Sequence, residues 1–186
     1  MGHGDDDAGG VQIAQPNTVA IDNPNGGLPR LALNGEQRNR GIELNAYGEL
    51  LPGFRLMGGA TLLDAIQTKT EGGLNDGNRA QGVPIIRTVV GGEWDTPFLH
   101  GLTLTGRVAY TGDQMVTDNR DMKIPSWTVI DLGARYVFDS PWNNKPIAVR
   151  FNVDNVFDKD YWSGAQNRYI TLGAPRIFRL SATFKF

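Results

Sequence analysis

The carboxy-terminal stretch from Arg176 to Phe186 alternates between apolar and polar side chains. Its apolar positions from 178 onward are Phe178, Leu180, Ala182, Phe184 and Phe186. A period of two predicts an extended strand with one apolar and one largely polar face. Two kinds of protein accommodate such a strand. A soluble sandwich buries the apolar face against a second sheet, whereas an outer-membrane barrel turns it to lipid and the polar face to a watery lumen.

The same alternation recurs along most of the chain. It occurs in residues 41–50, 54–63, 84–94, 102–111, 130–138 and 147–154, and more weakly in residues 11–15. Together with the terminal stretch, these segments predict about eight β-strands. The sequence therefore predicts an all-β fold.

The connections between the predicted strands alternate in length. Long polar connections occupy residues 16–35, 67–83, 112–125 and 158–173, and short turns occupy residues 51–53, 96–101 and 139–145. This alternation is typical of an antiparallel transmembrane β-barrel, with short periplasmic turns and long extracellular loops. Aromatic residues near the short turns, such as Trp94, Tyr136 and Phe138, suggest a girdle at the membrane interface. We therefore prefer the barrel to the sandwich.

Composition excludes several classes of protein. The formal net charge of -2 offers no basic surface, so nucleic acid is not an expected partner. The absence of cysteine removes disulfide and thiolate chemistry. No run of residues approaches the roughly 18 apolar residues of a membrane-spanning helix, but a barrel strand needs only about 9–11 alternating residues.

The first residues of the chain differ from the rest. Met1 to Asp7 lack the basic start and apolar core of a signal peptide. We interpret residues 1–10 as a leader or a cloning remnant, and residues 11–186 as the barrel segment.

Three stretches resemble the TonB-dependent outer-membrane receptors, especially the type that takes up ferric hydroxamate siderophores. Residues 155–161 match the family motif Asn-Leu/Val-Phe-Asp-x-x-Tyr, which closes the penultimate strand. The matching residues are Asn155, Phe157, Asp158 and Tyr161. Residues 35–44 resemble the stretch that opens a family strand, and residues 173–186 resemble the final strand with its terminal Phe.

The resemblance implies a location, an activity and partners. The family forms a barrel of about 22 strands whose lumen holds an amino-terminal plug domain. By this resemblance, the chain is the carboxy-terminal barrel segment of a bacterial outer-membrane receptor, without the plug and the amino-terminal strands. The receptor would import ferric siderophore with energy from TonB, which acts through the plug. The alternative is a self-contained eight-stranded barrel with a structural or adhesive role.

Ligand recognition is expected in the long loops. The candidates combine aromatic and amide side chains that can stack on and hydrogen-bond a ferric chelate: Gln114, Tyr161, Trp162, Gln166, Asn167 and Tyr169. Packing within the loops is an equally good explanation for these aromatics. We expect no cofactor and no resident metal, because the ferric siderophore is the transported ligand.

Three other features have a structural and a functional explanation. Phe178, Leu180, Ala182, Phe184 and Phe186 resemble the signal that the barrel assembly machinery reads by strand pairing, although an ordinary last strand has the same pattern. The family motif is more simply a strand-end device than a binding site. The charged side chains on the lumenal face form a solvated, mutually paired wall, or they dock the plug or serve substrate passage, and we favour the wall. They are Arg55, Arg87, Arg107, Arg135, Arg150, Arg179, Glu43, Glu93, Asp131 and Asp154.

Nothing in the sequence predicts an enzyme. The two histidines, His3 and His100, have no clustered partners for zinc. The serines lie in no nucleophile-elbow context. A calcium loop from Asp158 fails, because Ser163 and Tyr169 replace the glycine and glutamate that such a loop requires.

Overall fold

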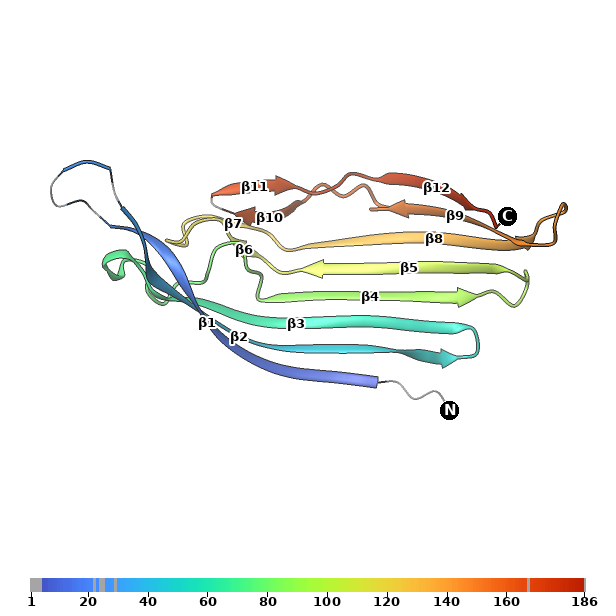
Figure 1. Cartoon of the computed structure of the whole chain (residues 1–186), viewed down its shortest axis with the longest axis horizontal. Coiled ribbons are helices and arrows are strands. Elements are labelled where there is room, and N and C mark those ends of the chain that lie inside the picture. Colours follow the sequence, from blue (N-terminus) through green and yellow to red (C-terminus); the bar gives the residue numbers. More distant parts are fainter. Residues whose placement is uncertain (1–4, 22, 24–25, 29, 167, 186) are drawn as a thin grey trace.

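The computed structural model describes residues 5–21, 23, 26–28, 30–166 and 168–185. Within them, an eight-stranded sheet runs in the order β1-β2-β3-β4-β5-β8-β9-β12 (Figure 1). Its strands are β1 (Asp5–Ile21), β2 (Arg30–Leu51), β3 (Phe54–Lys69), β4 (Ile86–Asp95), β5 (Leu102–Thr111), β8 (Trp127–Asp139), β9 (Pro146–Asp154) and β12 (Ile177–Thr183). The remaining elements are η1 (Glu71–Gly73), β6 (Gln114–Met115), β7 (Lys123–Ile124), β10 (Trp162–Gln166) and β11 (Tyr169–Leu172). All neighbouring strands of the sheet are antiparallel, which confirms the predicted architecture.

The large sheet is a single layer (Figure 1). Side chains of the apolar parity stay exposed on its outer face: Leu132 is 51% exposed and Leu180 is 74% exposed. Val149 is half-buried, because Tyr136 and Ala182 flank it on the adjacent strands. No described segment covers these side chains as a second sheet would, so the soluble sandwich is excluded.

The short and long connections lie at opposite ends of the sheet (Figure 1). At the turn end, β2 passes to β3 through a turn in which Gly53 has a φ of 79°. Gly101, in the turn before β5, has a φ of 83°. Backbone at positive φ favours glycine, which carries no Cβ. The strand bounds confirm all three predicted short turns, including the one between β8 and β9.

The first long connection is different from the prediction. Residues 16–35 belong largely to a β-hairpin, because β1 continues to Ile21 and β2 begins at Arg30. β3 likewise extends to Lys69, beyond the predicted end of its alternation. These extensions mix apolar residues, such as Val19, Leu31 and Ile66, with polar ones without strict alternation, and strands pair through backbone hydrogen bonds whatever their side chains. Hydrophobic periodicity therefore ends before the strands do.

The amino-terminal segment also enters the sheet. Residues 5–10, which fall within the predicted leader, pair in β1 with residues 42–47 of β2. The predicted strand of residues 11–15 is the central part of this longer strand. Whether residues 1–10 are a leader stays a prediction.

The two edges of the sheet remain apart. β1 lies at one edge and β12 at the other, and the described residues of these two strands do not pair (Figure 1). A self-contained eight-stranded barrel requires that pairing. Because open strand edges are not tolerated in lipid, the sheet by itself does not support this alternative.

Candidate functional site

Three connections pack against one another at the loop end of the sheet. They are residues 70–85, 112–126 and 155–176, and we call them the loop cluster. Val116, Ile124 and Ala165 form a small buried core where the second and third connections meet. Val116 is the most deeply buried of the three, at 1% exposed. The loop cluster therefore has a hydrophobic core separate from the sheet.

Hydrogen bonds join the second connection of the loop cluster to the first connection and to the end of β3. Asp118 accepts a hydrogen bond from Gln67 Nε2 to its carboxylate (2.8 Å) and one from Asn78 Nδ2 to its carbonyl (2.7 Å). Arg79 forms an ion pair with Asp113 at 3.2 Å. Further along the second connection, hydrogen bonds from Thr117 and Asn119 lower the pKa of Asp121. These contacts hold the connections in a defined arrangement over the sheet.

A polar pocket of about 290 Å³ lies between the loop cluster and the lumenal face of the sheet. The sheet contributes Arg87 from β4, Thr111 from β5 and Trp127 from β8. These three occupy one cross-strand row, because Arg87 pairs with Thr111 and Thr111 pairs with Trp127. The loop cluster contributes Gln114 from β6 and Gln166 from β10. We call this cavity the lumenal pocket.

The structure brings some of the predicted ligand-binding residues together. Gln114, which is 3% exposed, and Gln166 both line the lumenal pocket. Tyr161 packs on Trp127 with ring centroids 4.6 Å apart, and it lines a neighbouring cavity together with Trp162. Tyr169 is exposed and lines neither cavity. Asn167 lies outside the described residues.

Sequence reasoning missed two residues of the lumenal pocket as ligand candidates. Arg87 was assigned to the charged wall, and Trp127 was assigned no role. The sequence held a signal for Trp127, because this residue follows a long polar connection and lies an even number of positions from Asp131, on the same face of the strand. An aromatic side chain on the polar face next to a loop is a candidate for ligand contact. The signal was weak, because only the strand register shows that Trp127 and Arg87 lie in the same cross-strand row.

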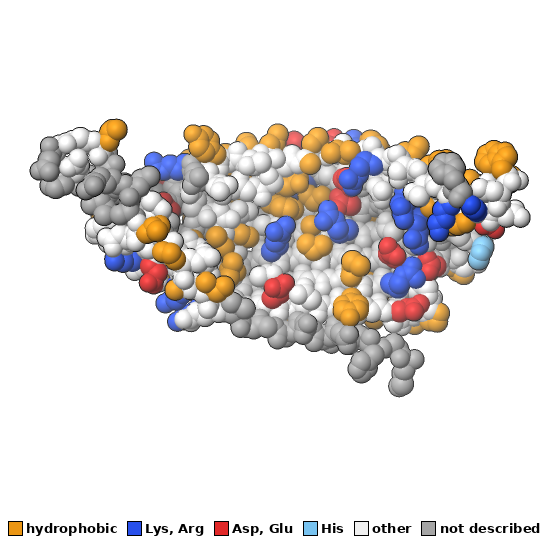
Figure 2. Space-filling model, in the orientation of Figure 1, with side chains coloured by type: hydrophobic (Ala, Val, Ile, Leu, Met, Phe, Trp, Pro, Cys, Tyr) orange, Lys and Arg blue, Asp and Glu red, His pale blue; other side chains and the backbone are white. Residues whose placement is uncertain are grey.

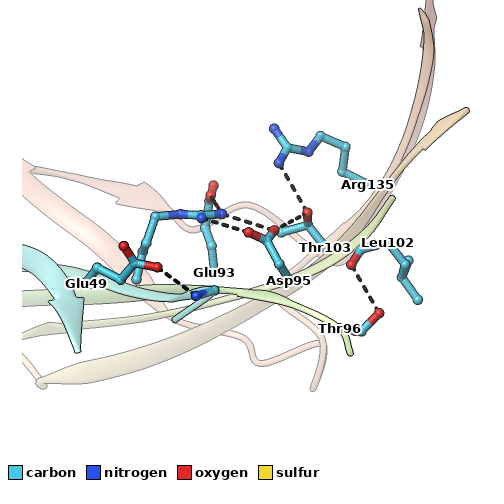
Figure 3. A network of polar contacts seen from close by, with 9 residues as sticks. Glu49, Glu93, Asp95, Thr96, Leu102, Thr103 and Arg135 are labelled. Atoms are coloured by element: carbon cyan, nitrogen blue, oxygen red, sulfur yellow. Dashed lines mark hydrogen bonds and ion pairs between the residues drawn. The ribbon is translucent and has the colours of Figure 1, made fainter. Parts of the chain in front are cut away.

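Charged side chains of the lumenal parity gather on one face of the sheet, as Figure 2 shows. At the turn end, Arg55 of β3 forms ion pairs with Glu93 (3.2 Å) and Asp95 (2.8 Å) of β4. Asp95 also accepts a hydrogen bond from Thr103 Oγ1, which in turn accepts one from Arg135 (Figure 3). These contacts connect β3, β4, β5 and β8 across their strand register.

The pairing continues across the later strands. Arg107 of β5 forms an ion pair with Asp131 of β8 at 2.6 Å, and Arg179 of β12 pairs with Asp154 of β9 at 2.7 Å. The paired wall that we favoured is therefore confirmed for these arginines. Arg87 and Arg150 are exceptions: neither has an ion pair or hydrogen bond with another described residue.

Two of the family-motif residues, Asn155 and Asp158, form a clamp between the last strands, whereas Phe157 is exposed. Asn155 is 3% exposed, and its Nδ2 donates hydrogen bonds to the carbonyls of Lys159 (2.9 Å) and Ala174 (3.0 Å). Its Oδ1 accepts a hydrogen bond from Lys159 N at 2.9 Å. Asp158 accepts a hydrogen bond from Arg176 N at 2.9 Å. Because these bonds join the end of β9 to the start of β12, the motif acts as a strand-end device here.

Two kinds of feature are absent from the described part of the chain. No group of three or more histidine, cysteine, aspartate or glutamate side chains is arranged to hold a metal ion there. No helix within the same residues has the length and apolar character to cross a membrane.

Comparison with known proteins assigns this architecture to a family. A family model described as "TonB dependent receptor-like, beta-barrel" matches residues 8–156. The chain belongs to the TonB-dependent receptor family. This membership confirms the resemblance noted in the sequence, the barrel-type fold and the bacterial outer membrane as its location. The family consists of transport receptors.

Individual relatives of this TonB-dependent receptor chain agree with the match. It is 42% identical over 154 residues to the ferrichrome receptor FcuA of Yersinia enterocolitica, covering 82% of this chain and 20% of that protein. It is 31% identical over 156 residues to the ferrichrome outer membrane transporter/phage receptor of Escherichia coli K12, again covering 82% and 20%. The crystal structure of BauA, the ferric preacinetobactin receptor from Acinetobacter baumannii, superposes with a TM-score of 0.83 at 36% identity, covering 95% of this chain and 26% of that one. The chain thus spans about a fifth of the length of these curated relatives.

The last strand of this TonB-dependent receptor chain is paired on one side among the described residues. β12 contains Phe178, Leu180 and Ala182, and it pairs with β9 in the register Phe178↔Val153. Phe184 follows the strand and is exposed, whereas Phe186 lies outside the described residues. The free edge of β12 is available for pairing with another strand.

Proposed function

We propose that this chain is the carboxy-terminal barrel segment of an outer-membrane receptor that binds and imports ferric siderophores. The plug domain and the remaining barrel strands of the receptor lie outside this sequence. TonB acts on the plug and supplies the energy for import. In this segment the loop cluster contacts the chelate from the extracellular side, and the paired wall lines part of its route.

One observation carries the proposal: a polar pocket opens between the loop cluster and the lumenal wall in a chain closely similar to a ferrichrome receptor. Ligand sites are concave and combine a few convergent polar groups with aromatic side chains. The lumenal pocket has both, since Gln114 and Gln166 meet Trp127 there. Tyr161 and Trp162 line the adjoining cavity and extend the same surface.

Iron uptake tests this function. The complete receptor that contains this chain would be produced in a bacterium that lacks its own siderophore receptors. Uptake of radioactive iron would be measured with ferrichrome, ferrioxamine B and pyoverdine as carriers. We expect uptake with at least one carrier in a TonB-positive host and none in an otherwise identical TonB-negative host. Equal uptake in the two hosts, or none with any carrier, would refute the proposal.

The terminal strand has a separate role in the same proposal. The apolar residues Phe178, Leu180, Ala182, Phe184 and Phe186 form the signal that the barrel assembly machinery recognises during insertion. Support comes from the free edge of β12, because strand addition uses the unpaired backbone of an edge and reads alternate side chains. Phe186→Ala should lower the amount of heat-modifiable receptor in outer membranes. Thr183→Ala, on the opposite parity, is the matched control and should leave that amount unchanged.

A further inference from the structure

Arg87 belongs to the paired wall of charged side chains on the lumenal face of the sheet, which we also call the lumenal wall. Unlike most arginines of this wall, it has no partner among the described residues. Arg55, Arg107 and Arg179 each contact a carboxylate. The residues paired with Arg87 on the adjacent strands are Thr61 and Thr111, whose hydroxyl groups carry no charge. No carboxylate of a described residue therefore forms an ion pair with this guanidinium at the loop end of the wall.

The surroundings of Arg87 favour an anion with oxygen acceptors. The side chains that line the lumenal pocket with it include Thr111, Gln114 and Gln166, which can donate hydrogen bonds, and none of the described residues that line the pocket carries a carboxylate. The indole Nε1 of Trp127, which also lines the pocket, is a buried donor without a partner among the described residues. Guanidinium groups bind carboxylates through two parallel hydrogen bonds, and these charge-assisted bonds are stronger than neutral ones.

The size of the pocket limits what can occupy it. Its volume of about 290 Å³ lies just below the range of roughly 300–1,000 Å³ for pockets that take up a whole drug-sized ligand. A pendant arm of a ferric chelate fits this space, whereas the chelate with its iron-bound groups needs more room. The neighbouring cavity at Tyr161 and Trp162 supplies about 420 Å³ beside it.

We propose that Arg87 and the lumenal pocket form a subsite for a carboxylate carried on a pendant arm of the ferric chelate. This inference rests on the proposed function, because it adds the charge of the ligand to a siderophore site. The carboxylate accepts hydrogen bonds from the Arg87 guanidinium, and the amides of Gln114 and Gln166 lie around it. Chelates with an anionic arm are consequently preferred to neutral ones of the same core.

A matched pair of ligands tests the subsite. Ferrioxamine B acylated on its free amine with an acetyl group is neutral at that arm, and the succinyl derivative ends there in a carboxylate. Their dissociation constants would be measured by tryptophan fluorescence quenching with the complete receptor that contains this chain. We expect the succinyl form to bind about tenfold more tightly, in line with a charge-assisted hydrogen bond. Arg87→Gln should reduce this ratio to about one, and Arg87→Lys should restore part of it.

Arg150→Gln is the control for a general charge effect. Arg150 is also lumenal and unpaired among the described residues, but it lies opposite Arg135, away from the lumenal pocket. We expect this variant to keep the wild-type ratio. The subsite is overturned if both variants lower the ratio equally, if Arg87→Gln leaves it unchanged, or if the wild-type receptor binds both forms equally well. Failure of the receptor to bind any ferric siderophore instead refutes the proposed function.

Discussion

The polar side chains of the lumenal wall and those of the loop cluster have different kinds of bonding partner. In the wall, the antiparallel register sets opposite charges on adjacent strands, as with Arg107 and Asp131. In the loop cluster, side chains bond to the backbone of another connection, as Asn78 does to the carbonyl of Asp118, around a small apolar core. The wall thus neutralises most of its charge within the sheet, whereas the loop end retains the free charge of Arg87. This difference suggests that the wall provides stability and the loop end provides recognition.

The largest effect is expected at Asn155, which joins the two regions. Asn155→Ala removes three hydrogen bonds of a buried side chain and leaves a non-glycine residue without a polar side chain at a φ of 49°. We expect a loss of about 3 kcal/mol in the free energy of unfolding. Denaturant unfolding of the receptor in detergent, followed by gel mobility, would measure it. Asn155→Gly, which tolerates positive φ, should recover about 1 kcal/mol; equal losses in both variants would mean that backbone conformation contributes nothing.

A smaller effect is expected within the wall at Asp131. Its carboxylate accepts hydrogen bonds from Arg107 Nε (2.7 Å) and from Asn155 N (2.8 Å), so Asp131→Ala leaves two donors unpaired. We expect a loss of about 2 kcal/mol in the free energy of unfolding, measured in the same way. Asp139→Ala, at the exposed end of β8, should change it by less than about 0.5 kcal/mol. A similar loss in both variants would contradict a stabilising role for the paired wall.

A still smaller and more local effect is expected in the loop cluster. Val116→Ala removes two methyl groups from the small core with Ile124 and Ala165, which should cost about 1 kcal/mol. Because this core is separate from the sheet, we expect faster proteolytic cleavage within residues 112–126 and no change in unfolding of the barrel. A matching decrease in barrel stability would show that the loop cluster and the wall unfold together.

The smallest effect is expected at the ion pair between Arg79 and Asp113. The pair joins two connections of the loop cluster, and the side chains of Arg79 and Asp113 are 18% and 36% exposed. Because solvent and salt screen such pairs, Arg79→Gln should cost no more than about 0.5 kcal/mol. Proteolysis within residues 112–126 should accelerate slightly at low salt, and the difference from wild type should vanish at high salt. A difference that persists at high salt would instead indicate a packing role for Arg79.

Sequence periodicity predicted the strands well where a strand lies against an apolar layer. The alternation around Leu104 and Leu132 marked both strands and their outward face correctly. It failed at the β1–β2 hairpin, because apolar and polar residues do not alternate strictly there (Leu31, Ala32 and Leu33 are consecutive), whereas the backbone still pairs. The β10–β11 hairpin, within a connection predicted as a loop, was missed because its strands have only five and four residues, too few to show a clear period.

The candidate site was predicted less completely than the fold. Gln114 and Gln166 were identified because amide groups in long loops suggest ligand recognition, and both line the lumenal pocket. Trp127 was overlooked, and Arg87 was assigned only to the wall. Their shared row depends on the register of β4, β5 and β8, which local sequence does not specify. The motif residue Asn155 was interpreted as structural, and its bonds to Lys159 and Ala174 became visible only in the fold.

The sequence by itself determined the period of the strands, the side that carries the apolar groups and the alternation of short and long connections. These properties follow from local chemistry, because successive side chains of a strand point to opposite faces and turns require particular residues. Only the tertiary structure decided which charges are neutralised and which one remains free beside the lumenal pocket. That outcome depends on pairing between strands far apart in sequence, where a shift of one residue would turn every side chain to the other face.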